Sequence, residues 1–449
     1  MQSKRFYYLH VLRSINMKKN RRSFIRLSGM AGIGLAGKKL FGSTGMLSGR
    51  VAGKSFPTFK NSDIMQTTDP GTNLIGPYGN WAAGLIGMDL PSMSYRRKEW
   101  EDIELWRKEA KKRLSERLAI PQIAGIPEVM KVKEYTYDGL QIEELKWQLP
   151  YGRPTEAILL KPAGAKGKLP AILAFHDHGG NKYFGTRKIT KVSDNPHPLM
   201  ASHQKDYYEG NAWANEIAKR GYVVLVSDAF PFASRRVMMQ DIPASQRMGL
   251  NDDNPEYPQN IEAYNNWASQ HEHVMAKSLF SAGLTWPGVF LAEDIKALDI
   301  LSAREDVDKD RIGCAGLSGG GMRTVFTGGF DSRIKCAVCV GFMTTWRDFI
   351  LNKSFTHTWM TYVPVLPKEL DFPEILGLRA PLPSLVLNDI NDQLYTYDEM
   401  KKAGDILTEI YQKAGAVNNF KVSYFPGPHK FDAAMQRVAF EWFDRWLKS

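Results

Sequence analysis

The feature of this sequence that most constrains its fold is a series of short apolar runs alternating with stretches of helical pattern. Residues 170–175 and 222–228 hold very few polar side chains, which is typical of strands buried on both faces. Alternation of such strands with helices indicates a mostly parallel, doubly wound α/β sheet covered on both sides. These strands are predicted at 170–175, 222–228, 311–315, 335–340, 383–387 and 420–424, and the helices at 213–220, 291–303, 397–414 and 433–448.

The sheet is expected to begin with antiparallel strands. Three stretches of β pattern precede residue 170, and Asp138-Gly139 is a turn signal between the first two. The three strands are predicted at 132–137, 142–149 and 155–160.

Three long segments interrupt the alternation. Residues 181–210 follow the first buried strand, residues 233–287 follow the second, and residues 344–381 precede the strand at 383–387. Connections of this length are usually lids or binding loops. Because they emerge on the carboxyl side of the sheet, where open α/β sheets bind ligands, we expect them to surround a binding site.

Residues 1–53 form a leader whose composition differs from the rest of the chain. The first 60 residues contain thirteen Lys and Arg and no Asp or Glu, and they account for the net charge of +11. The remaining chain has 46 basic against 48 acidic side chains. A near-neutral body gives no electrostatic reason to expect a nucleic-acid partner.

The leader contains Arg21-Arg22, followed by Phe24 and a weakly apolar stretch at 30–37. This order is similar to a twin-arginine export signal and predicts passage through the twin-arginine translocase into the periplasm, or secretion. The apolar stretch is too short to span a bilayer and no cysteine lies nearby to carry a lipid, so we expect no stable membrane anchor. The alternative is a disordered basic tail.

The rest of the chain is expected to comprise an N-terminal arm at 54–129 and a main domain at 130–449. Within the arm, residues 94–118 are highly charged, with Trp100, Trp106 and Leu114 between the charges. This pattern predicts an amphipathic helix that packs on the main domain.

The three cysteines are Cys314, Cys336 and Cys339, all in predicted core strands. An odd number at such positions does not suggest a disulfide framework. Cys336 and Cys339 are three residues apart, so on one strand they point to opposite faces. We expect all three to be small buried side chains.

Residues 316–320, Gly-Leu-Ser-Gly-Gly, connect the strand at 311–315 to a helical stretch. The pattern G-x-S-x-G between a strand and a helix is typical of a nucleophile elbow. Because the sharp turn holds the serine in a strained backbone conformation, its neighbours must lack side chains. Ser318 is therefore the candidate nucleophile, and the alternative is an ordinary glycine-serine turn.

A serine hydroxyl needs an adjacent base and an acid that orients the base. His429 follows the last predicted strand, at the same edge of the sheet as Ser318. The acid is expected between them in chain order, and the residues after strand 383–387 include Asp389 and Asp392. Asp392 is preferred because its distance from the strand end gives it reach toward His429, while Asp389 is the alternative.

Two backbone N–H groups are expected to form an oxyanion hole. The N–H of Gly319, one residue after the serine, is the first. The loop at 176–180 ends the first buried strand, and the N–H of His178 is the expected second donor.

Two histidine pairs also suggest metal ligands: His176 with His178, and His271 with His273 around Glu272. Both pairs are spaced i, i+2, and no cysteine or carboxylate cluster of metal-site spacing accompanies them. We therefore expect neither a metal nor an organic cofactor.

From about residue 130 to residue 447 the chain resembles the α/β-hydrolases, closest to the branch of acetyl-xylan esterases and dienelactone hydrolases. The loop at 176–180, the stretch at 222–236, the elbow, Asp392 and His429 follow the order of that branch. Two departures matter. Dienelactone hydrolases have a cysteine where this chain has Ser318, so lactone specificity is not implied, and acetyl-xylan esterases lack such long insertions, so their substrate is not carried over.

The residues and the resemblance together predict a serine esterase with a small-molecule or oligosaccharide ester as substrate. Family analogy and the aromatic residues of the insertions favour an acylated carbohydrate, and Arg323, Arg235 and Trp346 are the expected substrate contacts. One alternative is a serine peptidase with the same triad. The other is a carbohydrate-binding protein on a hydrolase fold that has lost catalysis, against which the intact Ser, Asp and His argue.

Overall fold

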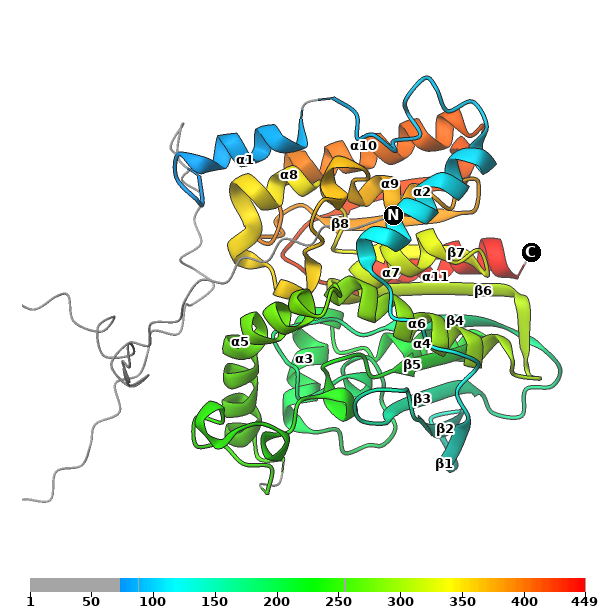
Figure 1. The fold of residues 1–449 in the computed structure, drawn as a ribbon. Helices are drawn as coiled ribbons and strands as arrows, with labels where there is room; N and C mark the ends of the chain where they lie inside the picture. Colours follow the sequence, from blue (N-terminus) through cyan, green and yellow to red (C-terminus); the bar gives the residue numbers. More distant parts are fainter. Residues whose placement is uncertain (1–72, 88, 254–255, 449) are drawn as a thin grey trace, which may run out of the picture. The chain divides into compact units, whose positions relative to one another are not determined.

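A nine-stranded mixed sheet, ordered β1-β2-β3-β5-β4-β6-β7-β8-β9, runs through the protein with helices on both faces (Figure 1). The computed structural model describes residues 73–87, 89–253 and 256–448, all within the unit Ile64–Ser449. The leader predicted at 1–53 lies outside the described residues. The predicted α/β class with a mostly parallel, doubly wound sheet is confirmed.

The sheet divides into a parallel part and an antiparallel part. Strands β5, β4, β6, β7, β8 and β9 are parallel neighbours, whereas β1, β2 and β3 pair antiparallel and β3 pairs antiparallel with β5. Asp138 and Gly139 both have positive φ, as a tight hairpin turn between β1 and β2 requires. The strands are β1 Val129–Tyr137, β2 Leu140–Trp147, β3 Thr155–Pro162, β4 Leu169–Phe175, β5 Val223–Ser227, β6 Val307–Leu317, β7 Ile334–Val340, β8 Ser384–Asp389 and β9 Phe420–Phe425.

Two hydrophobic cores lie on the two faces of the sheet. One packs side chains of α2, α6, α7, α9 and α10 against it, and the other packs α4, α11 and the end of α3. The predicted helices of the alternation are all present, shifted at their ends by a few residues. The helices of eight or more residues, with the short α4 and α9, are α1 Tyr78–Ile86, α2 Ile103–Leu118, α3 Pro198–Tyr208, α4 Trp213–Lys219, α5 Pro258–Ser281, α6 Trp286–Ser302, α7 Gly319–Phe330, α9 Phe372–Gly377, α10 Tyr397–Lys413 and α11 Ala433–Leu447.

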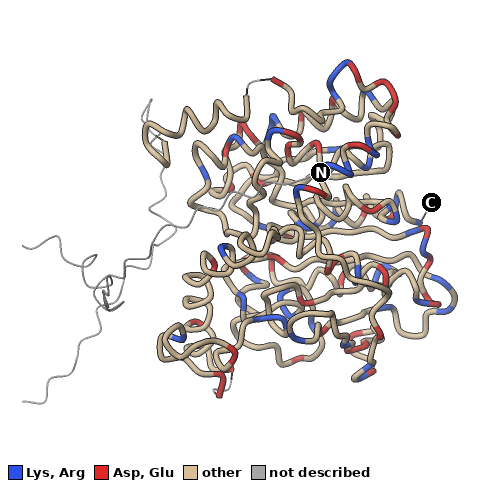
Figure 2. Tube along the Cα trace, in the orientation of Figure 1, with Lys and Arg blue, Asp and Glu red and all other residues tan. Residues whose placement is uncertain are grey.

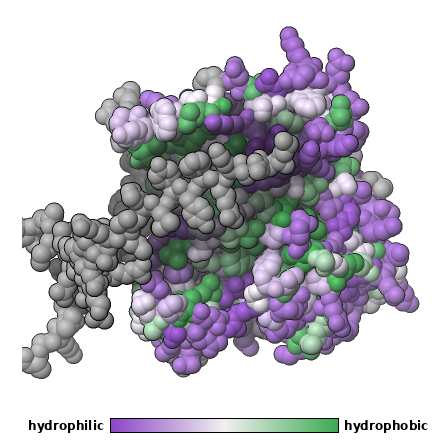
Figure 3. Space-filling view, viewed as in Figure 1, coloured by the Kyte–Doolittle hydropathy of each residue, from purple (hydrophilic) through white to green (hydrophobic). Residues whose placement is uncertain are grey.

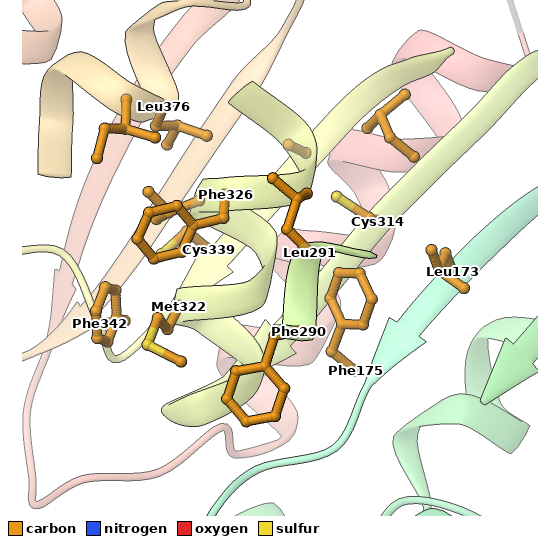
Figure 4. Packing of buried hydrophobic residues seen from close by; sticks show 14 of the residues in the cluster. Leu173, Phe175, Phe290, Leu291, Cys314, Met322, Phe326, Cys339, Phe342 and Leu376 are labelled. Carbon is orange, nitrogen blue, oxygen red and sulfur yellow. The ribbon is translucent and has the colours of Figure 1, made fainter. Parts of the chain in front are cut away.

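Alternate residues of the buried strands enter opposite cores. Leu173 and Phe175 of β4 pack with Phe290 of α6 and Met322 of α7 (Figure 4), while the intervening Ala174 faces the second core. This two-sided burial explains why the strand reads as a continuous apolar run.

The cysteines behave as predicted. All three are buried and free. Cys339 belongs to one core and Cys336 to the other, so the two lie on opposite faces of β7. Cys314 packs beside Leu291 in the first core (Figure 4).

The N-terminal arm contains a helix that is shorter than predicted. Helix α2 begins at Ile103 because the Asp102 carboxylate accepts hydrogen bonds from the N–H groups of Glu104 and Leu105 at 2.8 and 3.2 Å, a typical N-cap. Residues 94–102 form turns and irregular backbone instead. One face of α2, containing Trp106 and Leu114, is buried in the first core.

The long insertions contain helices that the sequence reading did not assign. Helix α5 lies in the second insertion, and its buried residues recur at helical spacing: Ile261, Tyr264, Trp267, Ala268, Glu272 and Ala276. The third insertion consists mainly of short helical turns between β7 and α9.

No described helix is long and apolar enough to cross a bilayer. Basic and acidic residues are interspersed along the trace (Figure 2), and the face drawn in Figure 3 is mostly hydrophilic with smaller apolar groups.

Candidate active site

Ser318 occupies a strained turn between β6 and α7. Its backbone has φ 59° and ψ −116°, a region that non-glycine residues rarely adopt. A Cβ atom at Gly316 would lie 2.6 Å from the carbonyl oxygen of Phe175, and one at Gly320 would lie 2.4 Å from the same atom. The two motif glycines are therefore required because β4 passes directly against the turn.

The turn opens into a cavity of about 460 Å³. The sheet contributes Ser318, His429 and the loop at 176–180 to its wall, and the insertions contribute the segment at 355–361 and Glu272. The long insertions thus line the cavity together with the strand ends, as their position in the chain predicted. Apolar side chains complete the wall: Phe232, Phe290, Leu317, Met322, Phe342 and Leu394.

His429 is held by a carboxylate at this cavity. Its Nδ1 lies 2.6 Å from Oδ2 of Asp392, and the other oxygen of Asp392 accepts the N–H of Leu394 at 2.9 Å. The imidazole Nε2 is buried and has no hydrogen-bond partner among the described residues. The structure therefore brings Ser318 and His429 to one cavity without a hydrogen bond between them.

The electrostatics of His429 suit a base. Burial lowers its pKa, but the charge of Asp392 and the hydrogen bond to it outweigh burial, so the pKa lies above the ordinary 6.5. The Asp392 carboxylate accepts the hydrogen of Nδ1 and so fixes His429 in the Nδ1–H tautomer. Nε2 is then free to accept a proton.

Asp389, the alternative acid, has a different environment. Its Oδ2 accepts the N–H of Lys430 at 3.0 Å, while its Oδ1 is buried without a partner. Burial raises the pKa of Asp389 to about 7. Of the two carboxylates, the structure puts Asp392 on the imidazole.

The two expected oxyanion donors, the backbone N–H groups of Gly319 and His178, lie on two segments that contact each other. A Cβ atom at Gly319 would lie 3.1 Å from the backbone nitrogen of His178, so the start of α7 touches the loop at 176–180. The ammonium of Lys188 donates to the carbonyl oxygens of Asp177 and His178, both at 2.8 Å. The carbonyl of Asp177 belongs to the same planar peptide as the N–H of His178, so its hydrogen bond with Lys188 holds that N–H in a fixed orientation.

The three expected substrate contacts fare differently. Arg323 lines the cavity; its Nε donates to Asp294 at 3.0 Å and its buried Nη1 has no partner. Trp346 is instead stacked on Phe372 with ring centroids 3.9 Å apart and does not line the cavity.

Arg235, also expected to contact the substrate, does not line the cavity either. It is almost fully buried and donates to Glu293 at 2.7 Å and to the carbonyl oxygen of Tyr151 at 3.2 Å. Its donors serve these internal partners, and it is absent from the cavity wall. Trp359, an aromatic residue of the third insertion, does line the cavity and is 44% exposed.

The histidine pairs considered as metal ligands have other roles. Nδ1 of His176 donates to the carbonyl oxygen of Asp177 at 3.0 Å, and His271 stacks on Trp267. Within residues 73–87, 89–253 and 256–448, no three His, Cys, Asp or Glu side chains gather in a way that would hold a metal ion.

Sequence reasoning missed the part that Glu272 plays in the cavity wall. It considered Glu272 only as a neighbour of His271 and His273, yet the carboxylate lies 3.1 Å from Nε2 of His178 and 2.5 Å from Nζ of Lys182. The available signal was an acidic residue in phase with the buried positions of α5.

Comparisons with known proteins find similar sequences. A model of the prolyl oligopeptidase family matches residues 281–375, which include the elbow. The "Putative hydrolase YtaP" of Bacillus subtilis (strain 168) is 26% identical over 309 residues, 68% of this chain and 88% of that protein.

Solved structures show the same fold. A "putative acetyl xylan esterase" from Bacteroides fragilis has a TM-score of 0.59 at 18% identity and covers 80% of this chain and 84% of its own. A glucuronoyl esterase from Solibacter usitatus has a TM-score of 0.54 at 13% identity, covering 80% of this chain and 98% of its own. With the sheet order and the elbow, these similarities show that the chain has the α/β-hydrolase fold.

Proposed function

We propose that the protein is a serine hydrolase that cleaves a carboxylic ester, with Ser318, His429 and Asp392 as its catalytic triad. The observation that carries this proposal is the 2.6 Å contact between His429 and Asp392 at the cavity that also contains the strained Ser318. Strain of this kind concentrates at functional sites, and the free Nε2 is the atom that the reaction needs.

In the proposed reaction, Oγ of Ser318 attacks the acyl carbon while Nε2 of His429 takes its proton. The N–H groups of Gly319 and His178 stabilise the oxyanion, each contributing about 3–4 kcal/mol. The tetrahedral intermediate collapses, and the imidazolium protonates the leaving alkoxide. Water, deprotonated by His429, then attacks the acyl-serine and releases the acid.

The substrate that we propose is an acylated or esterified carbohydrate. The esterases among the similar structures support this class, as does an aromatic side chain at the cavity. Trp359 is 44% exposed, and a flat exposed ring suits the apolar face of a sugar. Nη1 of Arg323, which has no partner, is a donor for an oxygen of the acyl or uronate part.

Labelling and turnover test this proposal. Wild type should hydrolyse p-nitrophenyl acetate and react with a fluorophosphonate at Ser318, and Ser318→Ala should lose both by about 10³-fold or more. Comparison of acetyl, feruloyl and methyl-uronate esters would then identify the acyl or alcohol part. Equal background turnover by wild type and Ser318→Ala on the whole panel would refute the enzyme.

A serine peptidase is the second candidate, because the matching family model is that of the prolyl oligopeptidase family. It would use the same triad on an amide, and its site would contact the chain on both sides of the bond. Peptide cleavage at a rate above that of every ester in the panel would favour this candidate.

We also propose export through the twin-arginine translocase, on the basis of Arg21-Arg22 and the apolar stretch after them. The N-terminal segment should direct a fused reporter to the periplasm. Replacement of both arginines by lysine should block export, and unchanged export would exclude this pathway.

A further inference from the structure

A single buried carboxylate connects the cavity loop at 176–180 to two of the insertions. Glu272 of α5 is 5% exposed. Its Oε1 contacts Nε2 of His178 at 3.1 Å, and its Oε2 accepts from Oγ1 of Thr358 at 2.7 Å and from the N–H of Trp359 at 3.1 Å. A carboxylate with this many donors is fixed in position.

The hydrogen bonds of His178 determine which ring nitrogen carries the proton. The N–H of Gly180 donates to Nδ1 of His178 at 3.1 Å, so Nδ1 is an acceptor and carries no hydrogen. Nε2 must then carry the hydrogen that points to Glu272. Hydrogen bonds at both ring nitrogens thus hold the imidazole of His178. The side chain of this residue, whose backbone N–H faces the elbow, cannot rotate freely.

The charge of the pair is balanced without protonating His178. Nζ of Lys182 lies 2.5 Å from Oε1 of Glu272, and this ammonium satisfies the carboxylate. Burial first, and then the charge of Lys182, hold the pKa of His178 below its usual value despite the hydrogen bond to Glu272. The ring is therefore neutral at physiological pH, as its two hydrogen bonds require.

We propose that Glu272 is a positioning residue for the oxyanion hole, which it serves by fixing His178 in the Nε2–H tautomer. The backbone N–H of His178 stabilises the transition state only when it points at the oxyanion. Loss of Glu272 disturbs this orientation and therefore lowers the rate of the chemical step. This inference rests on the proposed ester hydrolysis and adds to it a role for the second insertion, which supplies the carboxylate.

Kinetics of matched variants test the proposal. Glu272→Gln should lower kcat by about 10- to 100-fold with little change in KM, since small misplacement of a catalytic group has effects of this size. Glu262→Gln, an exposed position on the same helix, is the control and should change neither. A folded Glu272→Gln protein with kcat within twofold of wild type would overturn the proposal.

A double-mutant cycle tests whether Glu272 acts through His178. In a His178→Ala background, which keeps the backbone N–H but removes the ring, Glu272→Gln should cost less than about threefold, because the partner is already gone. Losses that multiply independently would show that Glu272 does not act through His178 and would overturn the proposal.

A spectrum of the wild-type protein keeps the proposal testable if the variants fail to fold. In purified protein labelled with ¹⁵N-histidine, long-range ¹H–¹⁵N correlation should show His178 as a neutral ring with the proton on Nε2. A charged ring, or a proton on Nδ1, would overturn the inference. This measurement needs no substrate, so it is independent of the activity assay. An inactive wild-type protein would refute only the proposed function, whereas the wrong tautomer would refute only the role of Glu272.

Discussion

Two histidine–carboxylate pairs border the same cavity but come from different parts of the molecule. His429 and Asp392 lie at the carboxyl edge of the sheet, on the connections after β9 and β8. His178 lies on the loop after β4, and its partner Glu272 comes from an inserted helix. In each pair a ring nitrogen is within hydrogen-bond distance of a carboxylate oxygen, yet the pKa of His429 is raised and that of His178 is lowered.

Burial lowers the pKa of both rings, and a cation beside one of the two carboxylates contributes to the difference between them. Lys182 forms an ion pair with Glu272, whereas no Lys or Arg of the described chain forms an ion pair with Asp392. An uncompensated carboxylate stabilises an imidazolium, and a compensated one does not. The first pair can therefore accept a proton during catalysis, while the second is suited to holding a neutral ring and its peptide in place.

The largest effect that tests this comparison is expected from Asp392→Asn. Loss of the charge and of the tautomer control should lower kcat by about 10³- to 10⁴-fold. Asp389→Asn, three residues away, is the matched control and should lower kcat by less than about threefold, because Asp389 is bonded to the N–H of Lys430 rather than to His429. Similar losses in both variants would contradict the assignment of Asp392.

The pH profile of kcat/KM should report the raised pKa of His429. The imidazole must be neutral to accept the proton of Ser318, so activity should be lost as the pH falls through a pKa above 6.5. In the residual activity of Asp392→Asn this limb should move to lower pH, because burial then acts without the opposing carboxylate. A wild-type limb below pH 6 would contradict the electrostatics described for this pair.

Lys182→Met should make the second pair resemble the first. Without the ammonium, Glu272 should raise the pKa of His178, and protonation of Nδ1 would break the hydrogen bond from Gly180. We expect kcat to fall by about 3- to 10-fold at neutral pH, with a larger loss in acid. Lys277→Met on the exposed side of α5 is the control. An unchanged titration of His178 in Lys182→Met would show that the cation does not set its charge.

The sequence predicted the pair of His429 and Asp392 better than the pair of His178 and Glu272, for a physical reason. The sharp turn at Ser318 demands glycines at fixed local spacing, and strand ends of one parallel sheet must meet at one edge. These constraints are readable along the chain. The contact between Glu272 and His178 joins residues 94 positions apart, and no local pattern specifies which inserted side chain reaches the loop.

The two misplaced substrate contacts have the same cause. Trp346 and Arg235 were selected by residue type and by position near the sheet edge, but residue type does not say which way a side chain points. Stacking on Phe372 and pairing with Glu293 are long-range contacts that direct both side chains inward. The helix α5 was missed because its segment is mostly polar, although its buried positions recur at every third or fourth residue.

The smallest expected effect concerns stability and comes from Asp389. Burial raises the pKa of this carboxyl to about 7 in the folded protein, above the value of about 4 expected for an unfolded chain. The folded state therefore holds the proton more tightly, and stability falls as the pH rises from about 4 to 7.

Asp389→Asn removes this loss and keeps an oxygen for the N–H of Lys430. We expect the variant to be more stable than wild type by about 1–2 kcal/mol at pH 8, with the gain absent at pH 4, as measured by denaturant unfolding at both pH values. A gain of equal size at pH 4 and pH 8 would show that the ionisation of Asp389 is not its source.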